Sequence, residues 1–175
     1  MALTVLIGGA CAGKSSLAAR MGEMTGLPVT FIATAQAGDK EMEERIARHR
    51  AERLAHWTTI EEPLDLARAL ELAGPDCAVI VDCLTLWVTN LVLKDHDNED
   101  IEKRAAAAAD IATQREAPTF VVTNEVGSGV HPSSELGRRF RDLLGRVNVI
   151  WAQRAADAFL VVAGRTIPLD LPDRP

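Results

Sequence analysis

The feature that most constrains the fold lies near the amino terminus, where an apolar run leads directly into a glycine-rich turn. Residues 3–7 read Leu-Thr-Val-Leu-Ile, and residues 8–15 match the pattern G-x-x-x-x-G-K-[ST]. In such a turn successive backbone N–H groups point at one anion, and a helix that follows adds the positive end of its dipole. Residues 14–24 can form that helix. The order strand, loop and helix predicts a binding site for a nucleoside triphosphate.

The residue types of this phosphate-binding loop assign roles to two side chains. Lys14 can reach the β- and γ-phosphates, and the Ser15 hydroxyl can ligate Mg²⁺. We expect the whole loop to contact the nucleotide, with Lys14 also catalytic: Gly8, Gly9, Ala10, Cys11, Ala12, Gly13, Lys14 and Ser15.

Composition limits the class of protein. A chain of 175 residues is long enough for one domain with its own core, and we expect a single domain over 1–175 with a loosely held tail at 169–175. A net charge of −6 argues against nucleic-acid binding, because a protein that tracks a phosphate backbone needs a basic surface. No segment is long and apolar enough to span a membrane, and the start lacks a signal-peptide pattern. The three cysteines have no metal-site spacing, so we expect a reduced, cytoplasmic protein.

Short apolar runs alternate with helical stretches along the chain. We expect strands at 3–7, 29–32, 78–81, 119–123 and 159–162, and helices at 14–24, 39–54, 63–72, 84–93, 101–115 and 133–155. Continuous apolar strands separated by helices indicate a mostly parallel sheet covered on both faces. This predicts a doubly wound α/β nucleotide-binding fold of the P-loop NTPase (RecA-like) type, with ligand at the carboxyl ends of the strands.

Two of the expected strands are followed closely by an acidic residue. Asp82 follows the apolar run 79–81, where phosphate-loop enzymes place a carboxylate beside the metal; the alternative is that Asp82 only caps the next helix. Glu125 lies in Thr-Asn-Glu-Val-Gly-Ser-Gly at 123–129, which suits either close approach of a ligand or an ordinary surface loop.

A histidine between arginines is the second informative segment. If residues 39–54 are helical, Arg45, His49 and Arg53 form one stripe, four residues apart. Two cations beside the imidazole disfavour its protonation and attract phosphates, as a histidine nucleophile would require. Spacing alone does not decide between a histidine nucleophile and a solvated charged helix. It favours the solvated helix, in which Glu41, Glu44 and Glu52 pair with the arginines.

Taken together, six segments resemble the bifunctional adenosylcobinamide kinase / adenosylcobinamide-phosphate guanylyltransferase family of coenzyme B12 synthesis. They are Gly8-Gly-Ala-Cys-Ala-Gly-Lys-Ser15, Phe31-Ile-Ala-Thr-Ala35, Glu44-Arg-Ile-Ala-Arg-His-Arg50, Val81-Asp-Cys-Leu-Thr-Leu-Trp-Val-Thr-Asn90, Val122-Thr-Asn-Glu-Val-Gly127 and Phe140-Arg-Asp-Leu-Leu-Gly-Arg-Val-Asn148. The resemblance covers essentially the whole chain.

The resemblance implies two reactions on one corrinoid substrate. A nucleoside triphosphate phosphorylates the hydroxyl of the aminopropanol arm of adenosylcobinamide; GTP then guanylylates an enzyme histidine, and the GMP passes to the substrate phosphate. The residue that matches this histidine is His49. The resemblance also implies GTP, ATP and Mg²⁺ as ligands, with Ser15 and Asp82 at the metal, and a homo-oligomer of trimer type. It further implies nucleotide contacts at Ala33, Thr34, Ala35, Arg50, Ala51, Glu52, Arg53, Glu61 and Asp82.

The chain departs from the family pattern at two places. The family loop commonly reads Gly-Gly-x-Arg-Ser-Gly-Lys-Ser, whereas this chain has Cys11 and Ala12 at the Arg-Ser positions, and Asp82 stands where some relatives carry Glu. Two alternative functions follow from the phosphate loop alone: a small-molecule kinase without guanylyltransferase activity, and a GTP-binding regulatory module. The second lacks the base-reading Asn-Lys-x-Asp motif of switch GTPases.

Overall fold

The computed structural model, which describes residues 3–36 and 54–171, is built on one seven-stranded sheet. The strand order is β3-β2-β4-β5-β1-β6-β7, and all neighbours are parallel except the antiparallel pair β6 and β7. The three strands β1, β2 and β4 are largely apolar, buried runs, as expected for parallel strands covered on both faces. The strand bounds are β1 Leu3–Gly8, β2 Val29–Ala33, β3 Thr58–Glu61, β4 Ala78–Asp82, β5 Thr119–Asn124, β6 Asp157–Val162 and β7 Arg165–Pro168.

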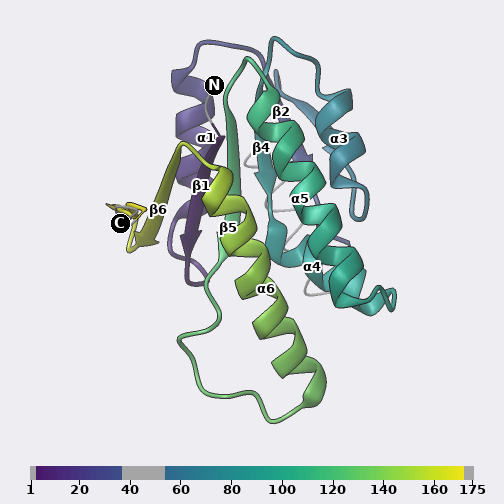
Figure 1. Cartoon of the computed structure of the whole chain (residues 1–175). Coiled ribbons are helices and arrows are strands. Elements are labelled where there is room, and N and C mark those ends of the chain that lie inside the picture. The colour runs from purple at the N-terminus through teal and green to yellow at the C-terminus, as the bar shows by residue number, and fades with distance from the viewer. Residues whose placement is uncertain (1–2, 37–53, 172–175) are drawn as a thin grey trace.

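Helices cover both faces of this sheet (Figure 1). On one face α1 packs against β4 and β5, over a core that includes Leu6, Ile80 and Phe120. On the other face α5 lies between α3 and α6, and these helices enclose a larger core with Trp87 and Trp151 fully buried. The helix bounds are α1 Lys14–Met24, α3 Leu66–Leu72, α4 Leu84–Leu93, α5 Asn98–Gln114 and α6 Glu135–Arg154. The predicted doubly wound, mostly parallel α/β fold is therefore confirmed.

The expected elements agree with the observed ones, with two strands missed. The five expected strands are all present, whereas β3 and β7 were not predicted because both are edge strands with largely exposed residues and no apolar run. Three helices begin at a capping side chain that spacing did not locate: Asp65, Asp97 and Ser134 each accept a hydrogen bond from a backbone N–H of the first turn. The helix expected at 39–54 lies outside the described residues except for Leu54, which is not helical.

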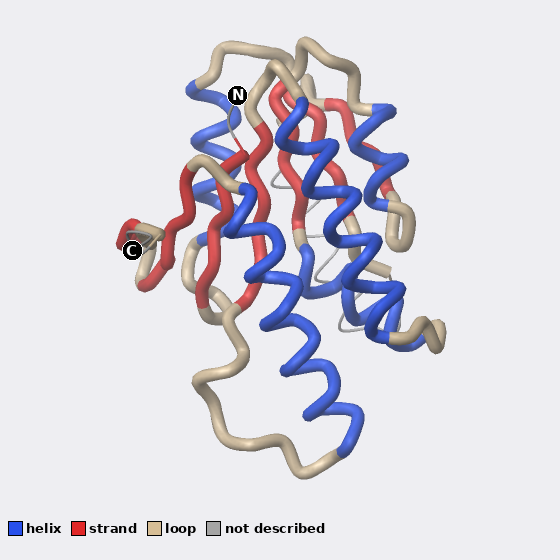
Figure 2. The backbone as a smooth tube through the Cα atoms, in the orientation of Figure 1, coloured by secondary structure: helices blue, strands red, loops and turns tan. Residues whose placement is uncertain are grey.

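The carboxyl ends of the parallel strands lie along one edge of the sheet. In Figure 2 the long loop between β5 and α6, drawn in tan, extends beyond the ends of the strands together with the first turns of α6. This is the edge where the parallel strands end, and where α1 and α4 begin.

Within the described ranges, no helix has the length and apolar character needed to cross a membrane.

The β6–β7 hairpin is closed by a two-residue turn with an unfavourable residue. Ala163 and Gly164 both have positive φ, of 51° and 73°, which is the geometry of a type I′ turn. Alanine rarely adopts this conformation, whereas Asn-Gly is the preferred pair. We therefore expect Ala163→Asn to raise the free energy of unfolding by about 0.5–1 kcal/mol. Urea denaturation would show this as a higher midpoint at an unchanged slope, and an unchanged or lower midpoint would contradict it.

Candidate active site

The phosphate-binding loop begins where β1 is in close contact with β6. A Cβ atom placed on Gly8 would lie 2.2 Å from the carbonyl oxygen of Val161, so only glycine fits. Gly13 has φ of 97°, and the Gly164 N–H donates to the Ala12 carbonyl at 2.8 Å. The hairpin turn after β6 thus supports the loop from outside the parallel part of the sheet. The loop conformation is fixed by backbone contacts on both sides.

The loop presents donors towards an anion. Gly13 occupies the N-cap of α1; in the described part of the chain no side chain caps this helix, and its first turn has no acidic residue. The N–H groups of the first turn are therefore available to a phosphate. Lys14 is 6% exposed, and its Nζ donates to the Gly9 carbonyl at 2.6 Å, which folds the ammonium group back over the loop. Ser15, one residue further on, is partly exposed.

Three of the other expected site residues lie level with one another on adjacent strands. Ala33, the last residue of β2, pairs with Asp82 on β4 and with Glu61 on β3. Asp82 pairs with Val122 on β5, which pairs with Leu6 on β1, two residues before the loop. The fold therefore brings the loop, Ala33, Glu61 and Asp82 to one edge of the sheet, although 74 positions separate Gly8 from Asp82 in the sequence.

The carboxylate of Asp82 has an unusual environment. Cys83, not Asp82, is the N-cap of α4, and no side chain of the described residues caps this helix, so the alternative role of Asp82 as a helix cap is wrong. Its Oδ2 is buried and has no hydrogen-bond partner among the residues that the structure describes. A buried carboxylate oxygen without a partner is costly. A cation at this position would remove that cost, so the residues present fit a metal ion.

Thr34 was expected to contact the nucleotide, but the structure gives its side chain another role. It is fully buried, and its Oγ1 donates to the Cys83 carbonyl at 2.7 Å and accepts from the Cys83 N–H at 2.8 Å. In this structure the Thr34 hydroxyl is therefore engaged with the backbone of Cys83, and its expected contact with the nucleotide stays a prediction. The neighbouring Ala35 is partly exposed and remains accessible.

Glu125 lies beside the phosphate loop, and its carboxylate closes its own turn. The Glu125 N–H donates to the Gly8 carbonyl at 3.1 Å, and Oε1 accepts from the N–H groups of Gly127 and Ser128 at 2.5 and 3.1 Å. Partial burial raises the pKa of this carboxyl, but the hydrogen bonds from Ser128 and Gly127 outweigh it and hold the pKa below its ordinary value. Glu125 is thus ionised at neutral pH, and its carboxylate is bonded to the backbone N–H groups of its own turn.

Cys83 is the thiol next to Asp82 and is inert at neutral pH. Burial, followed by the adjacent Asp82 carboxylate, raises the pKa of the Cys83 thiol to about 12. A thiol acts as a nucleophile only as the thiolate. Cys83 is therefore a poor nucleophile at neutral pH.

Polar residues of α4 and α6 form hydrogen bonds to the chain at the end of β5 and just after β2. These contacts were not predicted from the sequence. Thr85 Oγ1 accepts from the Asn124 N–H at 2.8 Å, and Asn148 bonds to both Thr123 Oγ1 and the Asn124 carbonyl at 2.7 and 3.0 Å. Asn90 Nδ2 donates to the Thr34 carbonyl at 2.7 Å. The signal that could have found Thr85 and Asn90 is their polarity within a mostly apolar helix, where each is buried.

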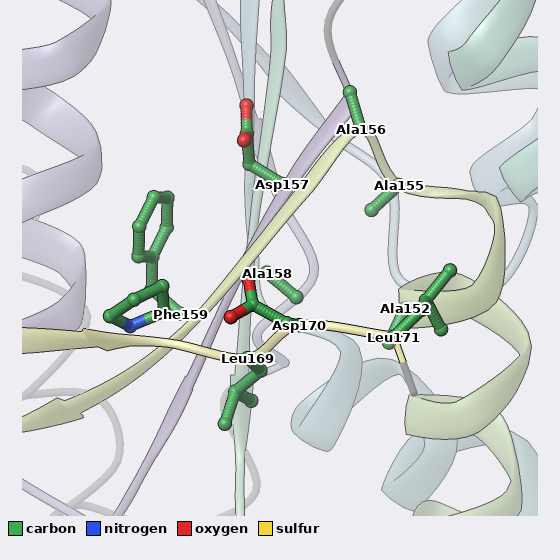
Figure 3. Close-up of a pocket in the computed structure, with 10 residues that line it drawn as sticks. Ala152, Ala155, Ala156, Asp157, Ala158, Phe159, Leu169, Asp170 and Leu171 are labelled. Carbon is green, nitrogen blue, oxygen red and sulfur yellow. The ribbon is translucent and has the colours of Figure 1, made fainter. Parts of the chain in front are cut away.

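A cavity of about 290 Å³ lies at the opposite edge of the sheet (Figure 3). It is lined by Ala152 and Ala155 at the end of α6, by Asp157 and Ala158 at the start of β6, and by Leu169 after β7. Asp157 pairs with Thr4, four residues before the phosphate loop. None of the expected site residues that the structure describes lines this cavity.

His49 and the adjacent Arg50, Ala51, Glu52 and Arg53 lie outside the described residues, so their expected roles stay predictions. The other expected residues meet at the carboxyl edge of the sheet.

Comparison with known proteins identifies the family. Residues 4–169 match the family described as cobinamide kinase / cobinamide phosphate guanyltransferase. The chain belongs to this family. It is 46% identical over 167 residues to the bifunctional adenosylcobalamin biosynthesis protein CobP of Pseudomonas aeruginosa, covering 94% of this chain and 95% of that protein. It is 39% identical to the protein CobU of Salmonella typhimurium, covering 93% and 96%. The resemblance inferred from the sequence is confirmed.

Solved structures support the fold of this cobinamide kinase / cobinamide phosphate guanyltransferase family member. The RadB recombinase is 17% identical, with a TM-score of 0.53 over 91% of this chain and 73% of that chain. A protein of Pyrococcus horikoshii OT3 is 9% identical, with a TM-score of 0.54 over 95% and 85%. At these identities the likeness concerns the fold, and it agrees with the predicted RecA-like P-loop arrangement.

Proposed function

We propose that this chain phosphorylates adenosylcobinamide and then transfers GMP to the product, giving adenosylcobinamide-GDP in cobalamin biosynthesis. The observation that carries the proposal is the meeting of the phosphate-binding loop and Asp82 at one sheet edge, in a chain whose family is described by both activities. The phosphate loop alone would fit a simple kinase or a regulatory GTP-binding module. Near full-length identity to two proteins named bifunctional favours the two-step enzyme.

In the kinase step, the hydroxyl oxygen of the aminopropanol arm attacks the γ-phosphorus, its proton leaves, and the nucleoside diphosphate departs. The N–H groups at the start of α1 and the Lys14 ammonium stabilise the charge that develops on the phosphate oxygens. The Ser15 hydroxyl and the Asp82 carboxylate would hold Mg²⁺, which neutralises phosphate charge when bound. Waters and phosphate oxygens would complete the coordination around these two protein groups.

In the guanylylation step, a neutral imidazole nitrogen of His49 attacks the α-phosphorus of GTP and pyrophosphate leaves. The phosphate oxygen of adenosylcobinamide phosphate then attacks the same phosphorus, and the histidine is released. Dividing a transfer between two anions into two displacements lowers each barrier, and flanking arginines offset the phosphate charge. Cys83, the thiol beside the proposed metal ligand, is protonated and cannot replace the histidine.

Several finer points belong to the same proposal. Ala33, Ala35, Glu61 and residues 50–53 contact the nucleotide, GTP supplies the GMP, and either ATP or GTP supplies the γ-phosphate. The chain acts in the cytoplasm as a homo-oligomer of trimer type. These points rest on the family resemblance.

The test is to incubate the protein and Mg²⁺ with adenosylcobinamide plus ATP, GTP or both, and to identify the corrinoid products by mass. The proposal predicts adenosylcobinamide-GDP whenever GTP is present, with the monophosphate as the earlier product. A monophosphate that never proceeds further would establish the simple kinase instead. An unmodified corrinoid under all three conditions would contradict both enzymatic functions.

A further inference from the structure

We infer that Thr34 and Asn90 are positioning residues that hold the Asp82 carboxylate at the metal site. This inference rests on the proposed role of Asp82 toward Mg²⁺. Asp82 ends β4, and the peptide unit that follows it is fixed by Thr34, the residue directly after the neighbouring strand β2. The Thr34 hydroxyl bonds to both the carbonyl and the N–H of Cys83, and the Thr34 N–H donates to the Asp82 carbonyl at 3.2 Å.

Three hydrogen bonds from one residue therefore fix the backbone on the carboxyl side of the Asp82 Cα atom. Thr34 is 0% exposed, so these bonds are shielded from water. A buried N–H or carbonyl that loses its partner costs free energy, which favours a shift of the chain towards another partner. Loss of the Thr34 hydroxyl would thus move the Asp82–Cys83 unit, and the carboxylate with it.

Asn90 holds Thr34 in turn. Its Nδ2 donates to the Thr34 carbonyl at 2.7 Å and to the Pro63 carbonyl at 3.1 Å, and the residue is 8% exposed. Because Pro63 follows β3 closely, this amide joins the ends of β2 and β3 to α4. Such outer contacts orient the groups that bind a metal, and their removal typically weakens metal binding tenfold or more.

The test uses Mn²⁺ as the probe and measures its binding by electron paramagnetic resonance, with the protein saturated with GDP. Wild type, Thr34→Val and Thr34→Ser are compared with Thr30→Val. Thr30 is the control because it is also a buried threonine, 5% exposed, and lies on β2 four residues before Thr34, where its hydroxyl bonds to the Cys77 thiol at 3.3 Å near the opposite end of the strand. Thr30→Val therefore makes the same change of side chain at a buried position away from Asp82.

We expect Thr34→Val to raise the Mn²⁺ dissociation constant about tenfold or more, and Thr34→Ser to restore it. Thr30→Val should leave it unchanged. If Thr34→Val does not fold, Asn90→Leu makes the same test and should weaken Mn²⁺ binding similarly. An effect no larger than that of Thr30→Val overturns the inference.

Asp82→Asn separates this inference from the proposed function. Weak Mn²⁺ binding in Asp82→Asn with normal binding in Thr34→Val and Asn90→Leu would overturn the positioning role alone. Normal Mn²⁺ binding in Asp82→Asn would remove the proposed metal role of Asp82, and the positioning role with it.

Discussion

Replacing Lys14 with alanine is expected to reduce both the kinase and the guanylylation step by about 10²–10³-fold. The Lys14 ammonium is buried in the loop at 6% exposed and bonds to the Gly9 carbonyl, so it is held where the phosphates bind. A fixed cation in a shielded site stabilises developing phosphate charge far more than one in water. We propose that the GTP of the guanylylation step is held in this same loop, so both steps should be lost together. The rates are measured from corrinoid products and from release of pyrophosphate.

The matched control for this substitution is Lys103→Ala. Lys103 is 72% exposed and pairs with Glu99 at 2.7 Å on the surface of α5, where an ion pair contributes little to stability. It should retain both activities. Full guanylylation in Lys14→Ala would show that the loop lysine acts only on the γ-phosphate, and would contradict its proposed role in both steps.

Replacing Gly8 with alanine should be among the most destabilising single changes in the chain. We expect it to lower the free energy of unfolding by about 3 kcal/mol. The added Cβ would lie 2.2 Å from the Val161 carbonyl oxygen and 3.2 Å from its carbon, and both belong to backbone within the sheet. Neither can move without breaking the pairing of β1 with β6. Urea denaturation measures the loss, and GTP binding of the folded fraction should fall because the phosphate loop starts at this residue.

Gly145→Ala provides the contrast. Gly145 lies within α6 and is exposed, and apart from the neighbouring backbone of its own helix no atom of the described residues lies within 4 Å of an added Cβ. Alanine is more favourable than glycine inside a helix, so the free energy of unfolding of this variant should rise by roughly 0.5–1 kcal/mol. Equal effects of the two substitutions would mean that the contact between β1 and β6 is looser than described.

The sequence predicted the parts of the site that local patterns encode. The phosphate loop was predictable because its glycines and Lys14 serve a local backbone geometry, and Asp82 because an acid follows an apolar strand. The edge strands β3 and β7 were not, because strands with exposed residues such as Thr58 and Arg165 leave no apolar pattern.

Contacts between distant segments could not be predicted at all. The family resemblance implied a nucleotide contact for Thr34, but the partner of its hydroxyl is Cys83, which lies 49 positions away. The support of the loop by Gly164 has the same character, since only the folded sheet brings the hairpin turn to Ala12. Residue type indicated polarity at Thr34, and the three-dimensional arrangement decided what its polar groups bind.

We propose that one nucleotide site serves both phosphoryl transfer and a covalent guanylyl step on His49. The most direct test is the intact mass of the protein after incubation with GTP and Mg²⁺, with the adduct located by peptide mapping. We predict one added GMP in the wild type and its loss in His49→Ala. The control is His56→Ala, which should retain the adduct; the His56 side chain of the wild type is 66% exposed beside Glu23. A wild-type protein without added GMP, or an adduct that persists in His49→Ala, would contradict the proposed histidine intermediate.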